Sequence, residues 1–167
     1  DMSGQTNHAT RVSGAPSYRT NVINGKPVVR FSTDNYGGDD LTFNRITTIR
    51  TVFWVLKENS GATVNAFFLG DSSLTYDFHR GNGNNGPLWD GANANANVLN
   101  GTTRLMGTVT NGTTALLPAN QFQVISLITV GNVQANQITQ DRTYRGSLKG
   151  DIAEIIIYTN ALTADQE

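Results

Sequence analysis

The sequence predicts an all-β fold, a sandwich or a barrel, and three observations lead to it. Short apolar and β-branched runs are separated by turn signals, helical periodicity is almost absent, and several runs alternate apolar with polar residues as strands do. The Asn-Gly dipeptide is the strongest of these turn signals, because both residues tolerate a positive φ. It occurs at positions 24–25, 82–83, 85–86, 100–101 and 111–112. The 167 residues suffice for one domain, 1–167, with a sizeable core.

Seven strands are predicted between the turns. They span residues 26–33, 49–57, 63–70, 74–79, 103–110, 122–130 and 151–158. The run 52–56 is apolar at every position, which predicts a central strand covered on both faces. In 74–79 the alternation places Leu74, Tyr76 and Phe78 on one face. The three isoleucines 155–157 are β-branched and suit the pleated surface of a buried strand.

Residues 81–97 are too polar and too rich in glycine to form a packed element. We expect a long loop with at most a brief strand near Leu88 and Trp89, and loops of this length are usually functional or disordered. After the last strand, Thr163 and Gln166 have the spacing of a capping box, which predicts that a helix begins there.

Composition excludes two classes of partner. The net charge of -1 provides no basic field for nucleic acid, and no apolar run approaches the roughly 20 residues that cross a bilayer. The chain has no cysteine, which is unusual for a secreted animal domain and compatible with a bacterial extracellular protein. It opens on a loop-like segment, so we expect a fragment of a larger protein.

Four segments carry a family resemblance. They are 1–9 (DMSGQTNHA), 24–31 (NGKPVVRF), 51–55 (TVFWV) and 150–163 (GDIAEIIIYTNALT). In this order they resemble bacterial laminin-G-like modules of the concanavalin-A-like lectin and glucanase superfamily. The resemblance implies a two-sheet antiparallel β-sandwich, a jelly roll, in a secreted or cell-surface protein. For many members it also implies carbohydrate binding or cell adhesion.

The chain departs from the family pattern at its start. Members usually have a strand upstream of the Asp1 loop, and that strand is absent here. One sheet would then have an unpaired edge, which is a liability for strand exchange. We expect an upstream segment or a partner chain to fill it.

Catalysis is not expected. A glycosidase needs two carboxylates flanking the scissile bond, and the only glutamates are Glu58, Glu154 and Glu167, with no acidic cluster on one strand. The two histidines, His8 and His79, have no nucleophile-elbow or triad context. Glu154 lies among isoleucines, where a lone carboxylate would be costly, so we expect it to be paired with an arginine.

The best candidate for ligand binding is a set of polar residues around one tryptophan. Sugar recognition combines an aromatic face with fixed polar groups, and Trp89 in its glycine-rich loop offers this combination. The candidate residues are Asp77, His79, Arg80, Asn82, Asn84, Trp89 and Asp90. The alternative interpretation makes Trp89 a plug that packs the loop onto the sheet.

A structural Ca²⁺ ion is the second candidate. Calcium takes roughly six to eight oxygen ligands, and Asp34, Asp39 and Asp40 crowd a Gly-Gly loop. The alternative is that these carboxylates only cap a turn.

Two functions follow from this reading. The first is a non-catalytic carbohydrate-binding or adhesion module that binds a glycan or polysaccharide outside the cell. The second is a structural or assembly module whose sheet edges contact neighbouring domains or chains.

Overall fold

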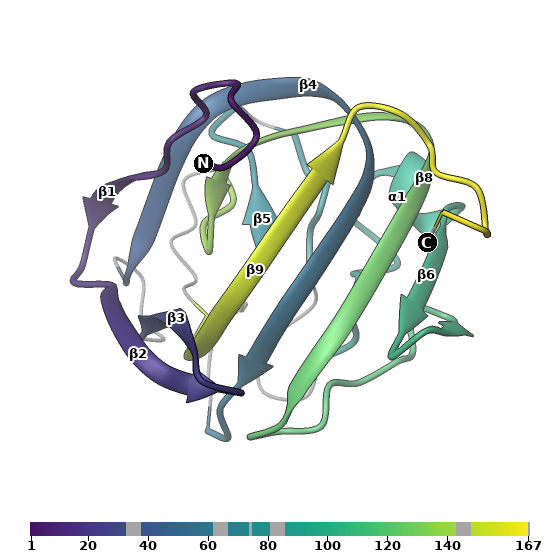
Figure 1. Cartoon of the computed structure of the whole chain (residues 1–167). Helices are drawn as coiled ribbons and strands as arrows, with labels where there is room; N and C mark the ends of the chain where they lie inside the picture. The colour runs from purple at the N-terminus through teal and green to yellow at the C-terminus, as the bar shows by residue number, and fades with distance from the viewer. Residues whose placement is uncertain (33–37, 62–66, 74, 81–85, 143–147, 167) are drawn as a thin grey trace.

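The computed structural model describes residues 1–32, 38–61, 67–73, 75–80, 86–142 and 148–166. These residues form nine strands and one short helix (Figure 1). The elements are β1 Thr10–Ser13, β2 Ser17–Ile23, β3 Lys26–Phe31, β4 Asp40–Glu58, β5 Leu69–Gly70, α1 Ala96–Leu99, β6 Thr102–Leu105, β7 Thr108–Thr110, β8 Phe122–Ile138 and β9 Gly150–Tyr158. Within these ranges, no helix is long and apolar enough to span a membrane.

The strands form one antiparallel sheet, which confirms the all-β fold class. Its order is β2-β3-β9-β4-β8-β6-β7, with β1 paired to β4 and β5 paired to β8. The division into the two packed sheets of a jelly roll stays a prediction, because the hydrogen-bonded order is that of a single sheet.

Two long strands give the sheet its curvature. β4 and β8 pair along most of their length, with register shifts between Thr42 and Thr51. Such irregularities bend a strand and increase its twist. Figure 1 shows β4 arching over the top of the molecule, with its first half beside β1 and its second half beside β9.

The core lies against one face of this sheet. Val52, Trp54 and Leu56 of β4 alternate as fully buried residues, and Ile125 and Leu127 of the neighbouring β8 are buried with them. On the opposite face, Phe53 and Val55 of β4 are half-buried. The expectation that β4 is covered on both faces therefore holds fully for the core face only.

The predicted strands agree best with the structure at the centre of the sheet. The strand predicted at 151–158 is β9, and those at 49–57 and 122–130 are parts of the longer β4 and β8. The strand predicted at 103–110 is a hairpin, because Met106 and Gly107 both adopt positive φ (51° and 78°) between β6 and β7. The predicted turn at Asn24 and Gly25 is confirmed, since it joins β2 to β3.

One strand prediction in the loops was wrong, and two other predictions hold only in part. The described residues of 74–79 form no strand, because the N–H of His79 donates to the carbonyl of Tyr76 in a turn. Of 63–70, only the end is strand, and 62–66 lies outside the described residues. The expected helix start is a single turn, in which the N–H of Gln166 donates to the carbonyl of Thr163. The N–H of Thr163 donates to Oε1 of Gln166, which is one of the hydrogen bonds of the predicted capping box.

The buried carboxylate of β9 is Asp151, whereas Glu154 is exposed. A register shift between Val55 and Leu56 explains the difference, because Leu56 faces Ile152 while Val55 faces Glu154. Strict alternation would place Glu154 on the inward face with Ile152, but the bulge turns it outward. The expectation of a buried Glu154 paired with arginine was therefore wrong.

Asp151 has the partners that its burial requires. Nε of Arg30 lies 2.6 Å from Oδ1, and Nζ of Lys57 lies 2.7 Å from Oδ2. Burial raises the pKa of Asp151, but the hydrogen bonds and positive charges of Arg30 and Lys57 outweigh it and hold the pKa below its usual value. This carboxylate ties β3, β4 and β9 together where they meet.

Asp151→Asn is expected to lower the free energy of unfolding by about 1–3 kcal/mol at neutral pH, since it removes the charge that both cations contact. A lowered folded-state pKa stabilises the fold above the unfolded-state pKa. That contribution is lost as the pH falls through the folded-state value. The difference between wild type and variant in urea denaturation should therefore shrink below about pH 4. The exposed Asp165→Asn serves as the control, and a difference independent of pH would contradict this account.

Candidate functional site

Trp89, the centre of the predicted ligand set, lies in the core. Its side chain is 1% exposed. The centroid of its ring lies 5.8 Å from that of Trp54 and 6.4 Å from that of Phe78. Its Nε1 donates to Oγ1 of Thr103 at 2.9 Å. Gly112 lies against the indole, where a Cβ would collide with it. The ring presents no face to a sugar, and this geometry is that of the plug interpretation.

Arg80 forms a buried ion pair. Its guanidinium donates to both carboxylate oxygens of Glu58 at 2.8 and 2.9 Å and to the carbonyls of Gly86 and Pro87. It also lies over the ring of Phe68, 4.6 Å from the centroid. A paired guanidinium of this kind fixes the loop onto the end of β4, because separating two buried charges is costly.

Asp77, His79 and Asp90 belong to a neighbouring polar network. The Asp77 carboxylate accepts hydrogen bonds from the side chain of Asn95 and the N–H of Gln134. Burial raises the pKa of Asp77, and these hydrogen bonds only partly oppose the effect. Nδ1 of His79 lies 2.8 Å from Oδ2 of Asp141.

Asp90 lies at the more exposed side of this network. Burial raises its pKa, but hydrogen bonds from Ala92 and Asn93 prevail and leave the pKa below its usual value. Asp77, His79 and Asp90 thus lie in one polar network, where their hydrogen bonds hold loops in place. Asn82 and Asn84, the remaining two members of the predicted set, lie outside the described residues.

The candidate calcium ligands Asp39 and Asp40 cap loops. The Asp39 carboxylate accepts from the N–H groups of Ala15 and Ser32, and Asp40 accepts from the N–H and hydroxyl of Ser13. Asp34 lies outside the described residues. Among the residues that the structure describes, no group of three or more acidic, histidine or cysteine side chains could hold a metal ion. Asp39 and Asp40 thus cap turns, as the alternative expects, and the calcium site stays a prediction.

An opening of the described surface lies elsewhere, along the free edge of β9. β3 pairs with β9 only from Gly150 to Ile152. Continuing this register would place Pro27 opposite Glu154, and Pro27 has no N–H to donate. The edge of residues 153–158 therefore has no strand partner among the described residues.

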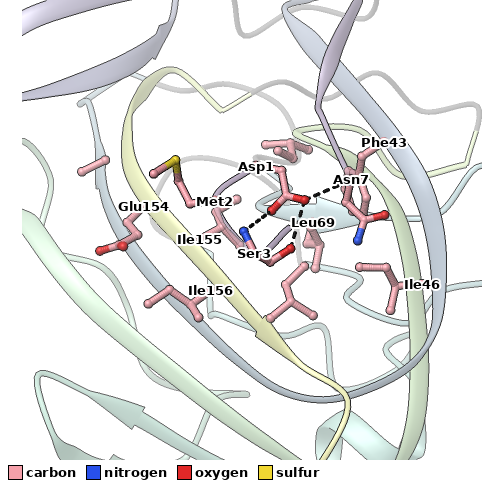
Figure 2. A pocket seen from close by; sticks show the side chains of 13 residues that line it. Asp1, Met2, Ser3, Asn7, Phe43, Ile46, Leu69, Glu154, Ile155 and Ile156 are labelled. Carbon is pink, nitrogen blue, oxygen red and sulfur yellow. Dashed lines mark hydrogen bonds between the residues drawn. The ribbon is translucent and has the colours of Figure 1, made fainter. Parts of the chain in front are cut away.

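Three adjoining cavities follow this edge. The central one, about 640 Å³, lies between the inner face of β9 and the apolar side chains of Phe43, Ile46 and Leu69 (Figure 2). A second of about 430 Å³ shares Ala153 and Glu154 with it and reaches the β2–β3 turn. A third of about 690 Å³ shares Ile46 and Ile157 with the central cavity and extends beyond Tyr158. We call these three cavities the β9 groove.

The β9 groove is mainly apolar in its middle and toward the β2–β3 turn, and it is polar at the end beyond Tyr158. Ile155 and Ile157 point inward with Trp54 and Val52, their partners on β4, and Ile138 of β8 adds to the apolar lining. The N-terminal segment forms another wall, in which the carboxylate of Asp1 accepts from the N–H groups of Ser3 and Asn7 (Figure 2).

The polar end beyond Tyr158 carries amide and hydroxyl groups together with one charged side chain, Arg45. Its lining includes Gln5, Asn7, Thr47, Thr48 and Asn160. Sequence reasoning predicted an unpaired edge but did not identify this groove. The signal that could have located it is Pro27, which cannot continue the pairing of its strand.

Comparisons with protein-family models, with curated proteins and with solved structures find no match to this chain. The laminin-G-like resemblance stays a prediction.

Calcium and a chelator are expected to give the same melting curve, because both oxygens of Asp39 and of Asp40 already accept hydrogen bonds. Differential scanning calorimetry in the two buffers checks this. A higher melting temperature in calcium than in chelator would indicate that the ion binds in this loop.

Trp89→Ala is expected to destabilise the fold by about 3–5 kcal/mol, because it empties a fully packed indole site. Thermal unfolding should shift down by roughly 10 °C. Thr103→Val, which removes only the hydrogen bond to the indole, should cost about 1–2 kcal/mol. If Trp89→Ala melted within a few degrees of wild type, the interpretation of Trp89 as a packing residue would be wrong.

Proposed function

We propose that this domain is a non-catalytic adhesion and assembly module that binds an extended segment of a partner polypeptide along the β9 groove. The observation that carries the proposal is the unpaired edge 153–158 beside three adjoining cavities. This is the protein-contact function expected from a free sheet edge. An extracellular location in a larger protein is part of the proposal, with support from the sequence resemblance alone.

The shape and chemistry of the groove favour an extended chain. Exposed N–H and C=O groups of a strand edge are satisfied by another strand, and main-chain hydrogen bonds then supply affinity while pockets for alternate side chains supply specificity. Six residues of β9 span roughly 20 Å. A ligand strand of similar length would place every second side chain between the inner face of β9 and Phe43, Ile46 and Leu69.

Carbohydrate binding is the second candidate, favoured by the polar end of the groove. Gln5, Asn7, Thr48 and Asn160 offer neutral donors and acceptors of the kind that recognise sugar hydroxyls. A glycan array distinguishes the two candidates. Saturable glycan binding, blocked by substitution of Asn160, would favour a sugar ligand over a polypeptide.

The strand-addition proposal predicts a particular response to N-methylation of a ligand. The probe is acetyl-Thr-Val-Thr-Val-Thr-amide, titrated into the ¹⁵N-labelled domain and followed by NMR. Along a strand, alternate N–H groups point to opposite sides, so only one set can pair with β9. Methylating the two Val nitrogens and methylating the three Thr nitrogens should therefore have unequal effects, with one peptide losing at least tenfold in affinity.

The shifts should fall on residues 153–158 and on the lining of the central cavity. Absence of binding, or equal binding by all three peptides, would overturn the proposal. Sedimentation of the domain alone gives a further check. If the domain alone is a dimer and the unmethylated peptide dissociates it, the edge binds a second copy of this chain. That result would overturn the assignment to a separate partner.

A further inference from the structure

Glu154 occupies a singular position in the β9 groove. It lines both the central cavity and the cavity beside the β2–β3 turn, and it is the only carboxylate that the two linings share. Its side chain is exposed on the outer face, opposite Val55 of β4. Among the described residues, no cation lies within ion-pair distance of it.

The surroundings of Glu154 suit a long basic side chain. The cavity toward the β2–β3 turn is lined by Ile23, Pro27 and Val55, which offer apolar surface to an aliphatic stem. Lys and Arg commonly bury such stems while the charged head group stays near water and a carboxylate. Lys26 lines the same cavity and carries the opposing charge, so the preference for a basic ligand residue is moderate.

The direction of the bound strand follows from its neighbours. β3 and β4 both pair with β9 antiparallel, and β3 occupies the same edge of β9 immediately before the groove. A ligand that continues the position of β3 therefore also runs antiparallel, with its C-terminal end toward Glu154. Side chains opposite Ile155 and Ile157 then point into the apolar cavity, and the side chain opposite Glu154 points outward.

We infer that Glu154 selects ligand strands with the pattern x-apolar-x-apolar-basic, read from N- to C-terminus. This inference rests on the proposed strand addition and names the partner chemistry of that groove. Lys or Arg at the last position contacts Glu154, and two apolar residues at alternate positions fill the space beside Phe43, Ile46 and Leu69.

The test compares acetyl-Thr-Val-Thr-Val-Lys-amide with acetyl-Thr-Val-Thr-Val-Glu-amide at low salt, with dissociation constants measured by NMR titration. Wild type should bind the Lys peptide about two- to fivefold more tightly, as expected for one exposed ion pair. Glu154→Gln should abolish the preference and Glu154→Lys should reverse it. Asp165→Asn, an exposed acid outside the groove lining, should leave it unchanged.

The outcomes separate this inference from the proposed function. If both peptides bind wild type equally and N-methylation still weakens one set, strand addition stands and the role of Glu154 is overturned. If neither peptide binds, both fall. The reversed sequence acetyl-Lys-Val-Thr-Val-Thr-amide tests direction, and tighter binding of this peptide would overturn the antiparallel assignment. Melting curves of the Glu154 variants should match wild type, because the side chain is exposed.

Discussion

The packing of Trp89 against Trp54 is the interaction on which much of this structure depends. Trp54 lies at the centre of β4, the strand that joins β9 to β8, and both rings are fully buried. The loop has little apolar surface of its own, and Leu88 and Trp89 fix its described part over the sheet. The Arg80 and Glu58 ion pair fastens the same loop to the end of β4. Because this face of the sheet is closed by its own loop, the opening of the β9 groove lies at an edge.

The polar residues that looked like a ligand site serve this closure. Asp77 accepts hydrogen bonds from residues 18 and 57 positions away, and His79 contacts an aspartate 62 positions away. Buried polar groups need such partners, and loops supply them where no ladder of main-chain hydrogen bonds exists. A dense set of Asp, His, Arg and Trp side chains in a loop can therefore serve to hold the loop in place rather than to bind a ligand.

The sequence predicts those parts of the fold in which local pattern and tertiary environment agree. The apolar run 52–56 and the Asn24-Gly25 turn are local features, and the structure has a central strand and a turn at these positions. The alternation at Tyr76 and Phe78 misled, because these residues lie in a turn, where Tyr76 is exposed while Phe78 is buried beside Asp77 and His79. Glu154 misled because its face depends on a bulge opposite Val55 and Leu56, which belongs to the pairing of two strands and to neither sequence alone. The candidate site was missed because it forms between β9, β4 and β5. Its one local signal, Pro27, marks where the pairing of β3 ends but not which residues lie beside the free edge.

The β9 edge also differs from the way proteins usually protect a strand edge. Protected edges carry lysine, proline, bulges or a covering segment that prevents pairing with other chains. The β9 edge has a bulge between Ile152 and Glu154, but residues 153–158 contain only one charge, Glu154, and three consecutive isoleucines. The proline of this region lies on β3, where it ends the existing pairing. Burying even part of the apolar groove would contribute about 25 cal/mol for each Å² removed from water. Such an edge is open to pairing with another chain. In the proposed complex, a ligand strand would cover the edge and its basic residue would lie opposite Glu154.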